Sequence, residues 1–204
     1  MGHDDEVEVR AIRTRTGYAG FFKISVTTLR HRRFDGTMGP ELTREVFQRG
    51  DAVAVLPYDP VADRVLLIRQ FLPGAWAAGR PARPLMAVAG MLDEAGEPAE
   101  ATARREAAEE AGIVLGTLIP AISFMPSPGG SSERVETFVA RADLSAAGGV
   151  HGLASEGEDI RVEVMDAEAA IALLDAGAIE AGPAVVLLLW FARHRARLRR
   201  DWTA

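Results

Sequence analysis

The chain contains no cysteine and only one lysine, Lys23, among its 204 residues. The lack of cysteine excludes a disulfide framework and a thiol nucleophile. Arginine therefore carries almost all of the positive charge, and we assign this bias no function. Because acidic residues outnumber basic ones and give a net charge of −6, the basic surface typical of nucleic-acid-binding proteins is not indicated.

The sequence also lacks an apolar run long enough to span a bilayer. The segment from Pro183 to Ala192 is strongly apolar, but it is about half of the roughly 20 residues that a spanning helix needs. A run rich in arginine follows it, so we expect a helix that packs on the core and ends in a solvated basic turn. The alternative is an amphipathic anchor on a membrane surface. Met1 to Glu8 are polar and acidic, unlike a signal peptide, and we predict a cytoplasmic protein that binds neither membranes nor nucleic acid.

A glutamate-rich helix is predicted between Pro98 and Gly112. Proline suits the first turn of a helix, and a glycine in the left-handed conformation commonly ends one. Glu109 and Glu110 follow Glu106 by about one helical turn, so the three carboxylates share a face. Their oxygens suit a hard divalent cation, which predicts a Mg²⁺ site that Mn²⁺ also fits. The alternative is a solvated helix with Glu–Arg pairs, in which the neighbouring glutamates would repel each other.

The segment from Arg105 to Ile113 resembles the second half of the Nudix box, the signature of the Nudix hydrolases. Glu97 also fits, because seven residues separate it from Arg105 as in the family. Six residues separate Gly90 from Glu97, where the family pattern has five. We interpret the difference as a tolerated insertion in the turn-like stretch from Asp93 to Gly96.

Further motifs make this resemblance more specific, and together they look like the ADP-ribose pyrophosphatase branch. They are Gly20 to Phe22, Arg44 to Gly50, Ser127 to Gly130 with Glu133 and Arg134, and His151 to Ala154 with Glu156, Glu158 and Asp159. A Nudix box alone would name a superfamily with many substrates, whereas ordered motifs along nearly the whole chain narrow the choice. The resemblance implies metal-dependent hydrolysis of ADP-ribose to AMP and ribose 5-phosphate.

The resemblance also implies roles for individual residues. The metal ligands would be the backbone carbonyl of Ala89 and the carboxylates of Glu106, Glu109, Glu110 and Glu158. The general base would be Glu156, although acidic loops that contain glycine are commonly only solvated turns. Arg105 would orient the carboxylates, and Glu109 would serve the catalysis as well as the metal. We expect His151 to shape its loop, because no second histidine or cysteine accompanies it at metal-binding spacing.

Substrate contacts are expected mainly from the N-terminal part, across a dimer. Phe21 and Phe22 can stack on an adenine ring, and alternation within a strand would point only one of them at the ligand; we favour Phe21. Arg44 and Glu45 can bind the base edge or the pyrophosphate. The other expected contacts are Arg49, Met91, Ser127, Pro128, Gly129 and Glu133.

The pattern of elements divides the chain into residues 1–47 and 48–204. The first part shows strands at 6–12 and 21–31 and is near the ~40-residue size below which domains rarely fold alone. The second part alternates strands (51–56, 64–69, 85–89 and around Ile122, Val135 and Val162) with helices, including those from Asp166 and Pro183. The resemblance implies a Nudix α/β/α sandwich with a mixed sheet, plus a small N-terminal β subdomain used in a homodimer.

Two positions depart from the family pattern. Leu72 stands where members commonly carry an arginine, and Met86 stands where a glutamate often precedes the Ala-Gly of the box. A lost charge-assisted hydrogen bond costs about 1.5 to 3 kcal/mol, and Arg69 or Arg80 are candidates to replace it. The alternative substrates are therefore other nucleoside diphosphate sugars, such as ADP-glucose or GDP-mannose. A Nudix-fold nucleotide sensor without activity is a further alternative, against which the intact carboxylate cluster argues.

Overall fold

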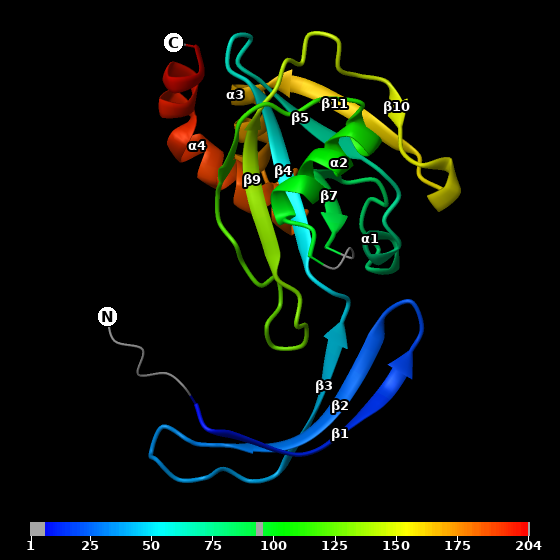
Figure 1. Ribbon diagram of the computed structural model, residues 1–204, viewed down its shortest axis with the longest axis vertical. Helices are drawn as coiled ribbons and strands as arrows, with labels where there is room; N and C mark the ends of the chain where they lie inside the picture. Colours follow the sequence, from blue (N-terminus) through cyan, green and yellow to red (C-terminus); the bar gives the residue numbers. More distant parts are fainter. Residues whose placement is uncertain (1–6, 93–95, 204) are drawn as a thin grey trace. The chain divides into compact units, whose positions relative to one another are not determined.

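The computed structural model describes residues 7–92 and 96–203 and divides into two units (Figure 1). Unit 1 comprises Met1–Gly50 and Met125–Glu133, and unit 2 comprises Asp51–Phe124 and Arg134–Ala204. The inserted loop expected from Asp93 to Gly96 lies outside the described residues except for its last glycine.

Unit 1 is an antiparallel sheet of three strands in the order β1-β2-β3. The strands are β1 (Val9–Ala19), β2 (Lys23–His31) and β3 (Leu42–Gln48). Every residue of β1 is exposed, and Val26 and Thr28 are the buried residues of β2. Burial within the chain therefore contributes little to the stability of this sheet.

The turn of the first hairpin holds both phenylalanines of the Gly20 to Phe22 motif. Ala19 pairs with Lys23, and the Gly20 amide donates to the Phe22 carbonyl at 3.0 Å, so β2 begins only at Lys23. The prediction that Phe21 and Phe22 lie in a strand is wrong, because the strand register leaves them in the loop that joins β1 to β2. Phe21 is 85% exposed, whereas the Phe22 ring packs on Phe47 with 5.1 Å between centroids.

Unit 2 is built on a sheet of eight strands among its described residues. Six of them run in the order β10-β11-β5-β4-β9-β8, with β6 beside β5 and β7 beside β4. The sheet is mixed, because β4 is parallel to β9 and the other pairs are antiparallel. The strands are β4 (Ala52–Asp59), β5 (Arg64–Arg69), β6 (Leu85–Met86), β7 (Val88–Met91), β8 (Leu118–Pro120), β9 (Val135–Arg141), β10 (Val150–His151) and β11 (Ile160–Asp166).

Two of the strands expected in unit 2 differ in detail from those observed, and in unit 1 the strand expected at 6–12 is observed at Val9–Ala19. The strand expected at residues 85–89 is divided at Ala87 into β6 and β7, which pair with different neighbours. The strand expected around Ile122 lies earlier, at Leu118–Pro120, because the Ile122 amide instead bonds the Thr137 hydroxyl at 3.1 Å. Because β6 pairs with β5 and β7 pairs with β4, the chain crosses from β5 to β4 just before the glutamate-rich helix.

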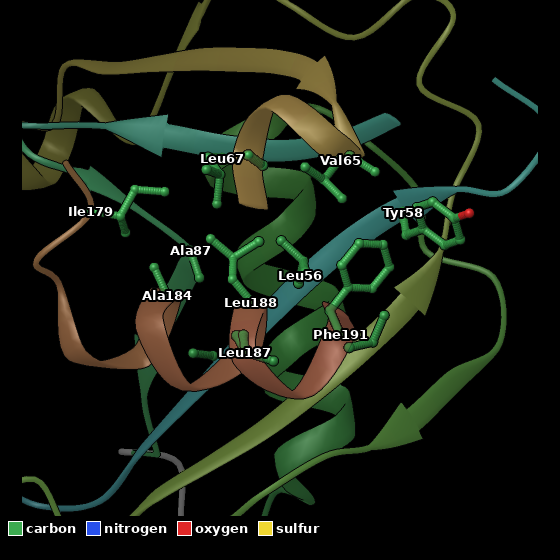
Figure 2. Close-up of a cluster of buried hydrophobic side chains, with 14 of the residues drawn as sticks. Leu56, Tyr58, Val65, Leu67, Ala87, Ile179, Ala184, Leu187, Leu188 and Phe191 are labelled. Carbon is green, nitrogen blue, oxygen red and sulfur yellow. The ribbon is translucent and has the colours of Figure 1, made fainter. Parts of the chain in front are cut away.

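Helices cover both faces of this sheet, which makes the predicted α/β/α sandwich (Figure 1). One face packs on α2 (Ala99–Ala111); the other packs on α3 (Ala167–Asp175) and α4 (Gly182–Thr203), while the short α1 (Pro73–Ala77) follows β5. Figure 2 shows Leu187, Leu188 and Phe191 of α4 pointing into the apolar core, as the sequence predicted for this helix. No helix in the described part of the chain is both long and apolar enough to cross a membrane.

The turn between β4 and β5 is joined to α4 by Asp63. This residue has a left-handed backbone (φ 58°), and its carboxylate accepts hydrogen bonds from Tyr58 at 2.8 Å and from Arg195 at 2.6 and 3.0 Å. Arg199 adds a contact at 2.9 Å. The bonds from Arg195, more than those from Tyr58, hold the pKa of Asp63 below its ordinary value.

Candidate active site

The glutamate-rich helix forms where the sequence predicts it. Pro98 is the N-cap of α2, and Gly112 ends the helix in the left-handed conformation (φ 64°). Ala103, Ala107 and Ala111 are buried on the sheet side. Because these side chains are small, the helix backbone lies close to the sheet and brings its glutamates near β5 and β7.

Glu110 is the most deeply buried carboxylate of the helix and is 2% exposed. It accepts hydrogen bonds from the Ala89 amide at 3.0 Å and from the Gln70 side chain at 3.4 Å. Burial raises the pKa of Glu110 to about 8, and the nearby charges of Glu106 and Glu158 act in the same direction. The structure thus brings Ala89 and Glu110 together with Glu106 and Glu158, which are also predicted ligands.

Arg105 lies between the other two carboxylates of α2. Its guanidinium donates to Glu106 at 2.9 Å and to Glu109 at 3.2 Å, and it is 3.7 Å from Glu97. Burial raises the pKa of Glu106 to about 7, although Arg105 partly opposes the shift. Gly90 accommodates this carboxylate, because a Cβ at that position would be only 2.5 Å from the Cγ of Glu106 and would overlap its oxygens.

These residues suit a hard divalent cation in their chemistry. Carboxylates and a backbone carbonyl are oxygen donors of the kind that Mg²⁺ prefers. Burial is the main cause of the raised pKa values of Glu106 and Glu110, and neighbouring carboxylates add to it, so a bound cation would relieve the cost of charging these groups. As the side chains stand, no three histidine, aspartate or glutamate residues within 7–92 and 96–203 are grouped closely enough to hold an ion. The guanidinium of Arg105 lies between the carboxylates of Glu106 and Glu109.

The predicted base lies on the segment that joins β10 to β11. Ala154–Glu156 form one turn of 3₁₀ helix, which ends at Gly157 in the left-handed conformation, and Glu156 is exposed. Glu158 is half-buried, and its carboxylate accepts from the Leu153 amide at 2.9 Å. Its charge raises the pKa values of both Glu106 and Glu110, so Glu158 belongs electrostatically to the group on α2.

Most of the expected substrate contacts lie in unit 1. Arg49 pairs with Glu133 at 3.1 Å, and its guanidinium is 5.8 Å from the centre of the Phe22 ring. Glu133 is 8% exposed, so the side chain expected to contact substrate is held by an arginine. Arg44 and Glu45 are exposed on β3.

The loop of unit 1 that carries Ser127, Pro128 and Gly129 is fastened to β3 through its backbone. The Phe47 amide donates to the Gly130 carbonyl at 2.8 Å, and the Ser132 amide donates to the Phe47 carbonyl at 3.2 Å. This places the loop beside Phe22 and Arg49. Met91, the remaining expected contact, is half-buried at the end of β7 in unit 2.

The two arginines considered as replacements at position 72 are engaged elsewhere. Arg69 is the last residue of β5 and Gln70 follows it directly, so the two side chains point to opposite sides of the sheet, and Gln70 is the one that contacts Glu110. Arg69 instead bonds the Arg83 carbonyl at 3.0 Å and lies 3.3 Å from Glu163. Arg80 is paired with Glu180.

The structure also adds residues that sequence reasoning missed. Gln70 reaches Glu110, and continuing the alternation of Leu66 and Ile68 one step beyond β5 is the signal that places it on the α2 face. Gly90 and Gly152 are needed for close approach, since a Cβ at Gly152 would lie 2.6 Å from the Cβ of Glu158. Alternation gives the face on which Gln70 lies but not its partner, because Gln70 and Glu110 are 40 residues apart.

Comparison with known proteins gives consistent results. The model of the NUDIX domain matches residues 48–187. ADP-ribose pyrophosphatase of Escherichia coli K12 is 43% identical over 195 residues, which cover 96% of this chain and 93% of that protein. ADP-ribose pyrophosphatase of Haemophilus influenzae is 37% identical, with coverage of 98% and 93%. GDP-mannose pyrophosphatase of Enterobacter sp. 638 is 36% identical over 150 residues, covering 71% and 75%.

Proposed function

Because the chain belongs to the Nudix hydrolase family, we propose that it hydrolyses ADP-ribose to AMP and ribose 5-phosphate with Mg²⁺, or with Mn²⁺ in its place. The observation that carries the proposal is the crowded carboxylate group of α2, in a chain 43% identical to a protein named ADP-ribose pyrophosphatase. The domain boundary proposed is near residue 48. We also propose a cytoplasmic homodimer to which unit 1 contributes; the fully exposed strand β1 supports this part of the proposal.

The pyrophosphate bond resists attack because its oxygens are negatively charged. A divalent cation neutralises that charge and lowers the pKa of a water molecule. The groups that would hold it are the Ala89 carbonyl, Glu106, Glu109, Glu110 and Glu158. Arg105 would keep Glu106 and Glu109 oriented, a role that its hydrogen bonds to both carboxylates support.

The chain's own residues would then manage water and substrate. Glu156 accepts a proton from water as the water oxygen bonds to phosphorus, and the bridging phosphorus–oxygen bond breaks to release the two phosphate monoesters. The exposed ring of Phe21 offers a stacking surface for adenine. Arg44, Glu45, Arg49, Met91, Glu133 and the loop of Ser127, Pro128 and Gly129 complete the proposed substrate contacts.

The direct test is to incubate the purified protein with ADP-ribose and Mg²⁺, with and without chelator, and to identify the products by chromatography. We expect AMP and ribose 5-phosphate in equal amounts, and no product with chelator. Retained binding of ADP-ribose without turnover would contradict the proposal and favour a nucleotide sensor.

The second candidate is the same reaction on another nucleoside diphosphate sugar. Leu72 supports it, because the arginine common in the branch is missing there, and relatives named GDP-mannose pyrophosphatase match 71% of the chain. A panel of ADP-ribose, ADP-glucose and GDP-mannose at equal concentration separates the two. A kcat/KM for ADP-ribose no higher than for the other two sugars would remove ADP-ribose as the preferred substrate.

A further inference from the structure

The imidazole of His151 lies directly against the end of the glutamate-rich helix. Gly112 has φ +64°, and a Cβ on this residue would stand 2.5 Å from Cε1 and 2.9 Å from Nδ1 of His151. Non-bonded carbon atoms do not approach so closely, so the ring can occupy this place only because residue 112 is glycine. The contact joins the last residue of the helix cap to β10.

Two hydrogen bonds fix the chain around this ring. Nε2 of His151 donates to the Gly148 carbonyl at 2.8 Å, which holds the ring in its own loop. The next amide, that of Gly152, donates to the Glu109 carbonyl at 3.1 Å. The loop that begins at Gly152 is therefore attached to the backbone of a residue we propose as a metal ligand.

The attachment continues from Gly152 to the acidic residues of the loop. Gly152 has φ +105°, and a Cβ there would lie 2.6 Å from the Cβ of Glu158. Leu153 donates its amide to the Glu158 carboxylate at 2.9 Å and accepts from the Glu156 amide at 3.0 Å. A displacement at His151 would pass along this short run of bonded backbone to both glutamates.

We propose that His151 is a positioning residue that holds the loop of Glu156 and Glu158 against the C-terminal end of α2. The inference rests on the proposed function, because that function gives these glutamates their roles in hydrolysis. His151 itself touches neither substrate nor metal. Its effect is to keep the base and one ligand at a fixed distance from the carboxylates of the helix.

The first test replaces His151 with alanine and uses His194→Ala as a matched control. His194 bonds the Trp190 carbonyl at 2.7 Å on α4, which packs on the opposite face of the sheet. A shift of a catalytic group by about 1 Å can cost about 100-fold in rate, so we expect kcat to fall roughly 10- to 100-fold in His151→Ala. KM should stay within about twofold, because most of the proposed substrate contacts lie in unit 1.

The second test reaches the same contact from the other side. Gly112→Ala places a methyl group where the imidazole lies, and Gly177→Ala is its control, with the same backbone strain (φ +69°) and nothing within 4 Å. We expect Gly112→Ala, but not Gly177→Ala, to lower kcat to a similar extent as His151→Ala. Combining Gly112→Ala with His151→Ala should give little further loss, because both remove one contact.

A readout apart from turnover separates this inference from the proposed function. Amide hydrogen exchange at Gly152 and Leu153 should become at least about tenfold faster in His151→Ala and stay unchanged in His194→Ala, with both proteins folded by circular dichroism. If wild-type protein hydrolyses no nucleotide sugar while exchange changes as expected, the proposed function fails and the attachment stands. Unchanged exchange, a change in KM alone, or multiplying losses in the double variant would overturn the positioning role.

Discussion

The two faces of the eight-stranded sheet are covered by helices of very different character. On the α4 side, large side chains such as Leu187, Leu188 and Phe191 fill the space above the sheet with no exposure to solvent (Figure 2). On the α2 side, the helix contacts the sheet through alanines and buries the carboxylate of Glu110. Both faces of the sheet are therefore apolar, but the helix that covers one of them also carries the glutamates.

This difference indicates that the α4 face contributes more to stability and that the α2 face holds the candidate site. A buried leucine or phenylalanine side chain contributes about 1.5 to 3 kcal/mol, whereas an alanine contributes much less and a buried carboxylate costs free energy. The α4 face thus supplies the stability that offsets the crowded charge on the α2 face. Substitutions on the two faces should accordingly separate stability from activity.

The largest effect is expected for Glu110→Gln, which should lower kcat about 10³- to 10⁴-fold, or about 4 to 5.5 kcal/mol, because a proposed metal ligand loses its charge. The melting temperature should stay equal or rise, since a neutral amide is less costly to bury than a carboxylate. Rates and calorimetry measured together test both statements. Glu100→Gln is the control, because Glu100 is exposed on the same helix and pairs with Arg104 at 2.8 Å; equal losses in the two variants would contradict the role of Glu110.

On the opposite face, Phe191→Ala should lower the free energy of unfolding by about 3 to 5 kcal/mol. The ring packs edge-to-face on Tyr58 with 4.8 Å between centroids, and its loss leaves a cavity in the apolar core. Urea denaturation measures the change, and kcat per folded molecule should remain within about twofold of wild type. A large fall in kcat without loss of stability would contradict the assignment of stability to the α4 face and of activity to the α2 face.

A smaller loss is expected for Asp63→Asn, which weakens the bonds from Tyr58 and Arg195 and should cost about 1.5 to 3 kcal/mol. Because the pKa of Asp63 is lowered on folding, its stabilising effect is fully present above its ordinary value of 3.8 and is lost as the pH falls through the lowered value. The gap in melting temperature between wild type and Asp63→Asn should therefore narrow as the pH falls below 3.8. A gap that stays constant or widens would exclude this ionic contribution.

The smallest effect is expected for Ala107→Leu, the one of these substitutions that should lower both stability and activity. Ala107 is fully buried between α2 and the sheet, and a larger side chain should push the helix away at a cost of about 1 to 3 kcal/mol. Glu106 and Glu110 would move with it, so kcat should fall as well. Ala108→Leu on the exposed side of the same helix is the control; normal activity in Ala107→Leu would show that the glutamates tolerate movement of the helix.

Local sequence rules predicted the elements of unit 2 well. The helix from Pro98 to Gly112 and the docked helix from Pro183 both depend on residues close together in the chain, and both are confirmed. The α/β/α sandwich, which the resemblance to the Nudix family implied, is also confirmed.

The sequence was less informative where distant segments meet. The turn position of Phe21 and Phe22 follows from a hairpin register that β1, exposed along its whole length, does not reveal by alternation. The return of residues 125–133 to unit 1 depends on the pairing of Phe47 with Ser131, more than 80 residues away. The contact of Gly112 with His151 likewise appears only when the folded backbone brings α2 and β10 together.

The hairpin that leaves Phe21 exposed also places the chain's one lysine at the start of β2, where Lys23 is exposed. An amine-reactive dye would therefore label unit 1 at this position and, apart from the terminal amine, nowhere else. A cysteine introduced into unit 2 would be the one thiol of the chain. Two dyes of different chemistry can thus be attached, one to each unit, so that energy transfer between them measures whether the distance between the labels changes when nucleotide is added.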